Sequence, residues 1–282
     1  MTRWCLAVGI FAATFLAPAV SAQIIPVPTL SIPQASLDES FSWQLSTGFD
    51  YTTGKYGAHC ALQSVALICT PSSTTVIDIP ATAMVQIDRL RLQVTVPYVD
   101  IVGPGKFAGV LGIPIIVAPA NNVVKQRSGL GDISVGGAWI VSREEAFWPT
   151  LEIAGVVKLP TAASGLGTGK TDYGAQVNLY HALLPGLTAF GSLGYQWIGD
   201  IGTVHLVSGG RATAGLDFKF AGNALGAALD YRQPSWQGGP DYLALEPYFK
   251  LDVIGVVGFS VYGIVGLTRS SPSQGAGLRI ML

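Results

Sequence analysis

Charged side chains are scarce in this sequence. Of its 282 residues only 12% are Asp, Glu, Lys or Arg, whereas 49% are apolar and 35 are glycine. Soluble domains carry about 25% charged residues, so the chain has too little charge to cover a soluble domain of its size. Lys and Arg number 16 against 17 Asp and Glu. With no basic surplus, binding to nucleic acid is not expected.

The sequence also lacks a long apolar run outside its N-terminus. The longest uncharged, mostly apolar stretch beyond that segment covers residues 253–268 and holds four glycines. A membrane-spanning helix needs about 20 consecutive apolar residues, and glycine disfavours helix. An apolar chain without such a run is typical of a closed β-barrel, the other structure that satisfies its backbone within lipid. The predicted fold class is therefore all-β, an antiparallel transmembrane β-barrel.

The N-terminus reads as an export signal. Arg3 supplies a positive charge, residues 5–15 are apolar, and Val20-Ser21-Ala22 places small residues at a cleavage site. Residues 1–22 are predicted to be a cleaved signal peptide; the alternative, an uncleaved anchor, is disfavoured by Pro18. Residues 23–40, which contain three prolines, are expected to form a periplasmic leader. The barrel domain then covers residues 41–282.

A period of two residues runs through most of this domain. Apolar residues alternate with polar or small ones in Phe41–Tyr51, in Arg89–Asp100 and in Arg211–Phe220. The same pattern is weaker near 75–85, 131–141, 150–160, 172–182, 187–198, 224–232, 241–251, 256–268 and 275–282. About ten residues suffice for a tilted strand to cross a membrane. The sequence thus predicts about twelve strands, joined alternately by long connections (53–74, 101–130, 161–171) and by tight turns.

The charges distinguish the two faces of these strands. A charged side chain facing the bilayer midplane costs about 2–4 kcal/mol, so charges within strands are expected to face the lumen. A soluble β-sandwich would also alternate, but it would carry average charge on its outer face. The predicted lumen charges are Asp50, Arg89, Arg91, Glu152, Lys158, Arg211, Asp217, Lys219, Asp230, Arg232, Glu246, Lys250 and Arg279.

Six apolar or aromatic residues share the lumen-facing positions. An open aqueous pore has no need of such residues, whereas flat aromatic faces pack well on ring-shaped solutes. We therefore expect them to contact a solute: Val156, Tyr180, Phe190, Tyr248, Tyr262 and Ile264.

Motifs for catalysis, cofactors and metals are weak or missing. Residues 164–171 (SGLGTGKT) nearly match a phosphate-binding loop, but Ser164 replaces the first glycine and a strand, not a helix, follows. A flexible outer loop is the preferred interpretation. The three histidines have no nucleophile elbow or metal-ligand spacing beside them. No enzyme activity, cofactor or metal is predicted.

One apolar segment has two interpretations. Residues 108–120 (AGVLGIPIIVAPA) lie within the long connection 101–130. Such a segment is unfavourable in water. It would either fold into the barrel mouth or extend the neighbouring strands beyond the membrane.

Three short motifs resemble a known family. They are Pro97-Tyr98-Val99-Asp100 with Gly103-Pro104-Gly105; Ser128-Gly129-Leu130-Gly131-Asp132; and Leu159-Pro160-Thr161 followed by Gly165-Leu166-Gly167-Thr168-Gly169. Together they resemble outer-membrane proteins named for the MetA pathway of phenol degradation. The resemblance implies a barrel that passes small, often aromatic or apolar, molecules. Leu282 departs from the aromatic residue with which such barrels commonly end.

The expected function is passive uptake of small apolar or aromatic molecules through a channel in the bacterial outer membrane. Its expected partners are the membrane lipid, the barrel-assembly machinery and the solute itself. The alternative functions are a structural, adhesive or plugged barrel without transport and, less favoured, an outer-membrane lipid hydrolase.

Cys60 and Cys69 are the two cysteines that remain after the signal peptide. In an exported protein this spacing predicts a disulfide. Closing a loop of about ten residues would stabilise the folded state by on the order of 2–3 kcal/mol. Thiol labelling of the unfolded, unreduced protein should find no reactive thiol. Labelling of two thiols would contradict the pairing.

Overall fold

A computed structural model describes residues 40–63, 66–104, 106–110, 113–117, 124–144, 148–199, 206–235, 240–253 and 257–282. Within 55–73 and 104–125 it describes the backbone only. The predicted signal peptide (1–22) and all but the last residue of the predicted leader (23–40) lie outside the described residues. No helix in the described part of the chain is long and apolar enough to cross a membrane.

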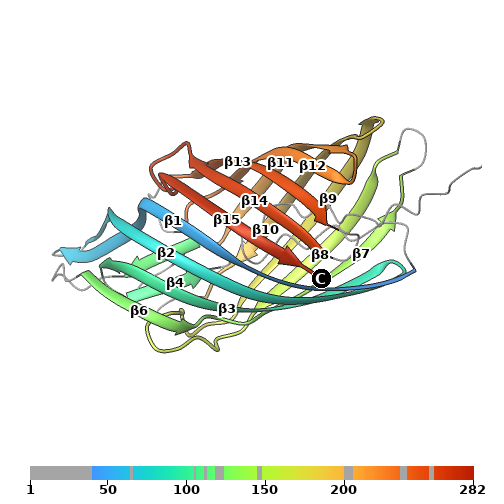
Figure 1. The fold of residues 1–282 in the computed structure, drawn as a ribbon. Helices are drawn as coiled ribbons and strands as arrows, with labels where there is room; N and C mark the ends of the chain where they lie inside the picture. The colour runs from blue at the N-terminus through green and yellow to red at the C-terminus, as the bar shows by residue number, and fades with distance from the viewer. Residues whose placement is uncertain are drawn as a thin grey trace, which may run out of the picture.

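The described residues form strands joined by turns and loops (Figure 1). The strands are β1 (Phe41–Gln63), β2 (Ala66–Ile87), β3 (Leu90–Pro104), β4 (Lys106–Val110), β5 (Ile113–Val117), β6 (Val124–Leu130), β7 (Ser134–Ser142), β8 (Thr150–Lys158), β9 (Asp172–Leu184), β10 (Leu187–Trp197), β11 (Gly209–Phe220), β12 (Asn223–Arg232), β13 (Tyr242–Val253), β14 (Val257–Gly266) and β15 (Gln274–Met281).

The main sheet closes on itself. In the described part of the chain it holds thirteen strands, each antiparallel to its neighbours. β6 and β7 pair with successive parts of β3 and so share one place in the ring, which leaves twelve positions. β1 pairs with β15 and completes the circle. The predicted transmembrane barrel of about twelve antiparallel strands is confirmed.

The two ends of the barrel differ, and we name them by their connections. At the turn end, where β1 begins and β15 ends, the chain reverses tightly at Asp88, at Gly186 and at Ala221-Gly222. Asp88 and Ala221 have φ of 51° and 47° and Gly222 has 81°, the backbone conformation that two-residue hairpin turns require. At the opposite, loop end lie the longer connections, such as 159–171.

The predicted connections 53–74 and 101–130 are wrong in extent. β1 and β2 continue to Gln63 and from Ala66, and β3 runs to Pro104, so the first strands project beyond the rest of the barrel (Figure 1). A strand that extends beyond the lipid no longer needs an apolar face. Its backbone pairing with the neighbouring strand therefore continues although apolar and polar residues no longer alternate. Cys60 and Cys69 are direct register partners in this projecting hairpin. Their side chains lie outside the described residues, so the disulfide stays a prediction.

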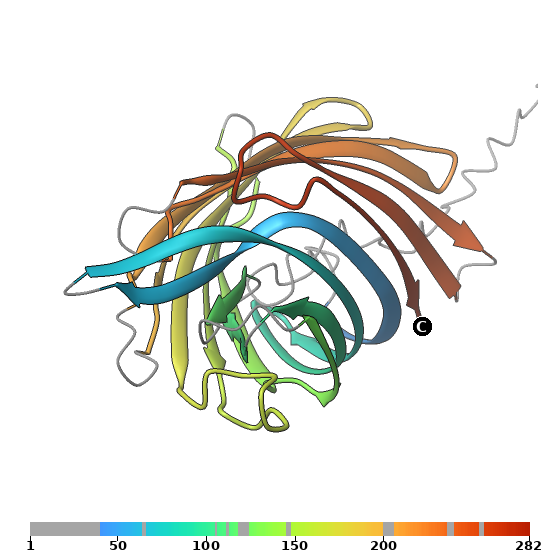
Figure 2. The same ribbon diagram turned by 90° about the vertical axis from the view of Figure 1, so that its left-hand side faces the viewer.

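Part of the apolar segment 108–120 forms a separate hairpin. β4 and β5 pair only with each other among the described strands, and β5 approaches β1. Figure 2 shows this green hairpin inside the outline of the ring. The arrangement fits folding toward the barrel mouth rather than extension of the wall.

The outer surface of the ring is apolar. Phe41, Trp43 and Leu193 are 61%, 58% and 69% exposed, and the residues that alternate with them are buried or half-buried. Each strand therefore has one apolar outer face and one inner face, as expected. An apolar outer face is what contact with lipid requires.

The closure between β1 and β15 can be tested by cross-linking. Outward-facing Thr47 and Ile280 are register partners, and directly opposite residues lie close enough for a disulfide. Thr47→Cys with Ile280→Cys, in a Cys60→Ser/Cys69→Ser background, should form a cross-link under mild oxidation. The control pairs Thr47→Cys with Leu278→Cys, which is shifted by two positions along β15. Equal cross-linking of both pairs would contradict the register.

Candidate functional site in the barrel interior

The structure places eleven of the thirteen predicted lumen charges in the interior. Each of the eleven is less than a tenth exposed: Asp50, Arg91, Glu152, Lys158, Arg211, Asp217, Asp230, Arg232, Glu246, Lys250 and Arg279. The other two, Arg89 and Lys219, are exposed at the turn end. Both lie beside tight turns, where side chains reach water. Arg89 donates to the carbonyl of Val141, 3.1 Å away.

Ion pairs join several of these charges, within one strand or between strands. Arg279 on β15 pairs with Asp50 on β1. Arg91 on β3 pairs with Glu152 on β8, reaching across β7. Asp230 accepts from Arg232 at 2.5 Å. Pairing lowers the cost of burying these charges in the interior.

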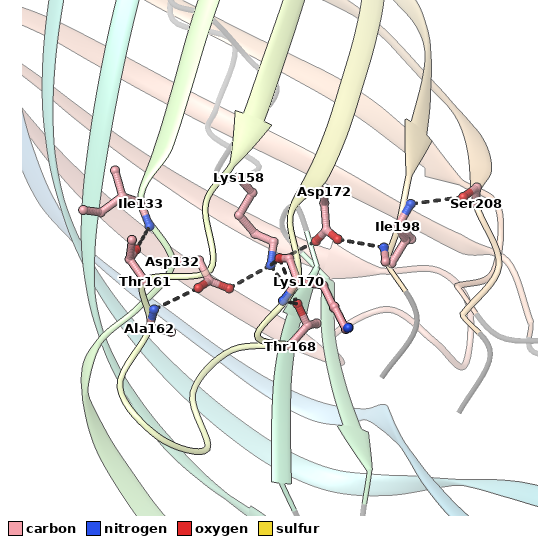
Figure 3. A network of polar contacts seen from close by, with 11 residues as sticks. Asp132, Ile133, Lys158, Thr161, Ala162, Thr168, Lys170, Asp172, Ile198 and Ser208 are labelled. Carbon is pink, nitrogen blue, oxygen red and sulfur yellow. Dashed lines mark hydrogen bonds and ion pairs between the residues drawn. The ribbon is translucent and has the colours of Figure 1, made fainter. Parts of the chain in front are cut away.

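A second set of contacts centres on Lys158 at the loop end (Figure 3). Its ammonium lies 2.7 Å from a carboxylate oxygen of Asp132 and 3.0 Å from one of Asp172. It also donates to the Thr168 hydroxyl at 3.0 Å and to the carbonyl of Lys170 at 3.2 Å. One buried cation therefore holds two carboxylates and the connection 159–171.

The two carboxylates extend this network to the backbone. Asp132 accepts from the amide of Ala162 at 2.9 Å, and Asp172 accepts from the amide of Gly199 at 3.0 Å. The Thr161 hydroxyl accepts from the amide of Ile133 at 2.8 Å. Alternation within strands missed Asp132 and Asp172, because one precedes its strand and the other begins it. Two of the motifs of the family resemblance meet here.

The connection 159–171 is folded against the inner wall and is not a free loop. Leu166 is buried against Val99 and Ile101 of β3, with Val76 of β2 beside them. A Cβ at Gly167 would lie 2.7 Å from the Asp132 carboxylate, so a larger residue there would disturb the network. The segment that nearly matches a phosphate-binding loop is thus held against the wall by these contacts.

Four buried aromatic residues of the interior form one cluster. Tyr180, Phe190, Tyr248 and Tyr262 pack together with Ala228, and Ile264 packs against them. They come from β9, β10 and β12–β14, so the cluster covers a broad part of the inner wall. Val156 on β8 is also buried but outside this cluster. We call the four aromatic residues with Ala228 and Ile264 the aromatic band.

Glycines on neighbouring strands let the rings lie along the wall. Cβ atoms added at Gly215, Gly226 and Gly277 would collide with the rings of Phe190, Tyr248 and Tyr262, respectively. Sequence reasoning missed these glycines, because their role appears only when the strands are paired.

Two of the tyrosines are also anchored by hydrogen bonds. The Tyr248 hydroxyl on β13 passes over Gly226 on β12 and donates to Asp217 on β11 at 2.7 Å. In the same way Tyr262 on β14 passes over β15 to donate to Asp50 on β1. Each ring is thereby fixed along the wall by a carboxylate two strands away.

The described residues hold no cluster of His, Cys, Asp and Glu that would bind a metal. His181 lies 2.9 Å from a carboxylate oxygen of Glu144 near the turn end. The side chain of His59 and the whole of His205 lie outside the described residues.

These features define a transmembrane β-barrel with an apolar exterior and a polar, aromatic interior. No protein-family model and no curated relative matches the sequence. Its fold is that of a crystallised outer-membrane channel from Pseudomonas putida F1, with a TM-score of 0.64 at 12% identity over 91% of this chain and 98% of that one.

Two other solved barrels are less similar. The monoaromatic hydrocarbon channel CymD gives a TM-score of 0.44 at 9% identity over 93% of this chain and 92% of that one. The Pseudomonas putida toluene transporter TodX gives 0.40 at 11% identity over 85% and 87%.

The contacts of Lys158 predict that its replacement destabilises the protein, mainly at the connection 159–171. Lys158→Met would leave Asp132 and Asp172 buried without their cation, a loss of about 3–5 kcal/mol. We expect a lower urea midpoint in lipid vesicles and faster protease cleavage within 159–171. Lys170→Met is the matched control, because it removes a positive charge from an exposed side chain of the same connection. Equal effects of the two substitutions would contradict the assignment.

Proposed function

We propose that this barrel lies in the bacterial outer membrane and passes small apolar or aromatic molecules passively across it. The observation that carries the proposal is the aromatic band, which places four rings on the inner wall of a closed barrel. A transmembrane barrel that served only as an anchor has no need of aromatic side chains inside. The fold shared with an outer-membrane channel supports the same function.

The interior charges fit such a channel. Arg279 with Asp50 and Arg232 with Asp230 form pairs along the wall, so their fields largely cancel and strong ion selectivity is not expected. Interior carboxylates also orient the band, since Asp50 and Asp217 accept hydrogen bonds from Tyr262 and Tyr248. We infer that the charges brace the wall and that the six predicted residues, Val156, Tyr180, Phe190, Tyr248, Tyr262 and Ile264, contact the solute.

Membership of the family named for the MetA pathway is also part of the proposal. Its support is the meeting of two quoted motifs around Lys158, with Asp132 from one and Thr161 and Thr168 from the other. If these motifs are a family signature, we expect their residues to contact one another although they are distant in sequence. The expected partners are then membrane lipid, the barrel-assembly machinery and the solute.

The alternatives differ in what they require. A plugged or structural barrel is favoured by the β4–β5 hairpin within the ring outline (Figure 2) and by the connection 159–171 against the wall. A lipid hydrolase would need a Ser–His pair, yet the one histidine whose side chain is described, His181, contacts Glu144. The test below separates transport from a structural role.

Deletion of the protein from its native host should slow the initial uptake of toluene at limiting concentration. Sugar and ion permeability should be almost unchanged, because the interior favours apolar ring solutes. Equal loss for all solutes would identify a general porin. No loss for any solute would favour the structural alternative.

A substitution locates the effect in the band. Phe190→Ala removes one ring and should lower toluene uptake by roughly 2- to 10-fold, the range that one aromatic contact supplies. Phe218→Ala is the matched control, because Phe218 lies on the outward face of the adjacent strand β11 and is 47% exposed. Toluene uptake that falls equally in both variants would exclude a specific role for the band.

A further inference from the structure

Three rings of the aromatic band lie opposite a glycine on the neighbouring strand. The Cβ atoms of residues directly opposite each other on one face are about 4.5–5.5 Å apart, so each ring faces a position without a side chain. The register pairs are Phe190 on β10 with Gly215 on β11, Tyr248 on β13 with Gly226 on β12, and Tyr262 on β14 with Gly277 on β15.

The placement of the ring atoms shows that each ring extends over its glycine. A Cβ at Gly277 would collide with Cζ and Cε1 of Tyr262, and a Cβ at Gly215 would collide with Cζ and Cε2 of Phe190. These atoms lie at the far end of the ring, away from the strand that carries it. The rings therefore run sideways along the wall and do not point at the barrel axis.

Tyr262 is held at both ends. Its hydroxyl donates to Asp50 on β1, and the two carboxylate oxygens of Asp50 accept from Arg279 on β15. The ring thus spans the whole of β15 above Gly277. Phe190 has no polar group with which to anchor its ring, so the space over Gly215 is what lets it lie along the wall.

A side chain at Gly277 would leave the ring of Tyr262 one direction in which to move. The three atoms nearest to such a Cβ belong to the side chains of Tyr262 and Asp50. Asp50 is paired with Arg279, and the wall lies behind the ring. Overpacked side chains change their rotamer where they can, so the ring would turn toward the barrel axis.

The rings lie at one level of the interior. Phe190, Tyr248 and Tyr262 belong to a single contact cluster, although they come from three strands. The wall around them has twelve strand positions, and a barrel of that size is narrow. An inward turn of one ring would therefore reduce the width that is left for a solute at this level.

We propose that Gly215, Gly226 and Gly277 determine the width of the ring compounds that the channel admits, because each holds one aromatic side chain against the wall. The inference rests on the proposed channel function and adds a size criterion to it. Rings with a single small substituent pass more readily than rings substituted on several sides. The glycines are positioning residues, since they act through the aromatic rings and do not contact the solute.

The test compares two hydrocarbons that differ in width: toluene and 1,3,5-trimethylbenzene. Initial uptake at limiting concentration is measured in the deletion host that expresses the wild-type protein or a variant, after subtraction of uptake by the deletion host itself. The readout is the ratio of trimethylbenzene to toluene uptake, which does not depend on the amount of protein in the membrane. Gly277→Ala should lower this ratio by about 5-fold.

Removal of the ring should have the opposite effect. Tyr262→Ala clears the space over Gly277, while Asp50 keeps its pair with Arg279, so the ratio should rise. The double variant Gly277→Ala/Tyr262→Ala should match Tyr262→Ala alone, because the added methyl group has no ring to displace. A double variant with the low ratio of Gly277→Ala would overturn the proposal.

Two further variants isolate the role of the glycine. Gly155→Ala on β8 is the matched control, because Gly155 is exposed and a Cβ there would lie 3.6 Å from the carbonyl oxygen of Gly174, an ordinary contact. Its ratio should be that of the wild type. Tyr262→Phe keeps the ring over Gly277 and should also leave the ratio nearly unchanged. A ratio that falls as far in Tyr262→Phe as in Gly277→Ala would assign the position of the ring to its hydroxyl and refute the role of the glycine.

The outcomes separate this proposal from the function on which it rests. Toluene uptake that depends on the protein, with a ratio unchanged by Gly277→Ala and Tyr262→Ala, would refute the size limit and leave the channel intact. If Gly277→Ala does not reach the outer membrane, Tyr262→Ala alone decides, and an unchanged ratio refutes the limit. Uptake of both hydrocarbons that is independent of the protein would refute the channel function and this proposal with it.

Discussion

The exclusion of charge from lipid is the constraint on which the rest of this structure depends. Each strand has one face in an apolar environment, so fourteen of the acidic and basic side chains that the structure describes are buried within a twelve-position ring. Charges at such close quarters are stable only when they are paired. The pairs Arg279–Asp50 and Arg91–Glu152 therefore join strands that are far apart in sequence, and they stiffen the wall that carries the aromatic band.

Glycine reconciles this polar interior with aromatic side chains. In a narrow barrel a tyrosine that pointed at the axis would fill the lumen, but Gly226 and Gly277 leave room for Tyr248 and Tyr262 to lie along the wall. A carboxylate then fixes each hydroxyl. Asp50 thus does two things, because it pairs with Arg279 and also orients the ring of Tyr262. Tyr180 departs from this arrangement, since its hydroxyl faces Arg91 and Glu152, and that departure is what distinguishes its part of the wall.

The loop end follows a different principle. There a single buried lysine is the organising contact of the connection 159–171, whose backbone bonds to the preceding segment only at isolated points, from Leu159 to Ile133 and from Ala163 to Leu130. Lys158 gathers Asp132, Asp172 and Thr168, and Leu166 packs on β3. Figure 3 shows how contacts from β8, β9 and the segment before β7 converge on this one ammonium. The glycine-rich segment that resembles a nucleotide site thus has a structural role, held by polar contacts and by packing.

The sequence by itself determined the fold class, the approximate number of strands and the face on which most charges lie. These follow from alternation, which is a local property enforced by lipid on one side of each strand. It did not determine the projecting parts of β1–β3, where water on both sides removes the alternation, nor the exposed positions of Arg89 and Lys219 beside turns. The contact partners were decided only by the tertiary structure. Asp50 and Arg279 are 229 positions apart, and Arg91 meets Glu152 across an intervening strand, so such pairs depend on the register with which the barrel closes.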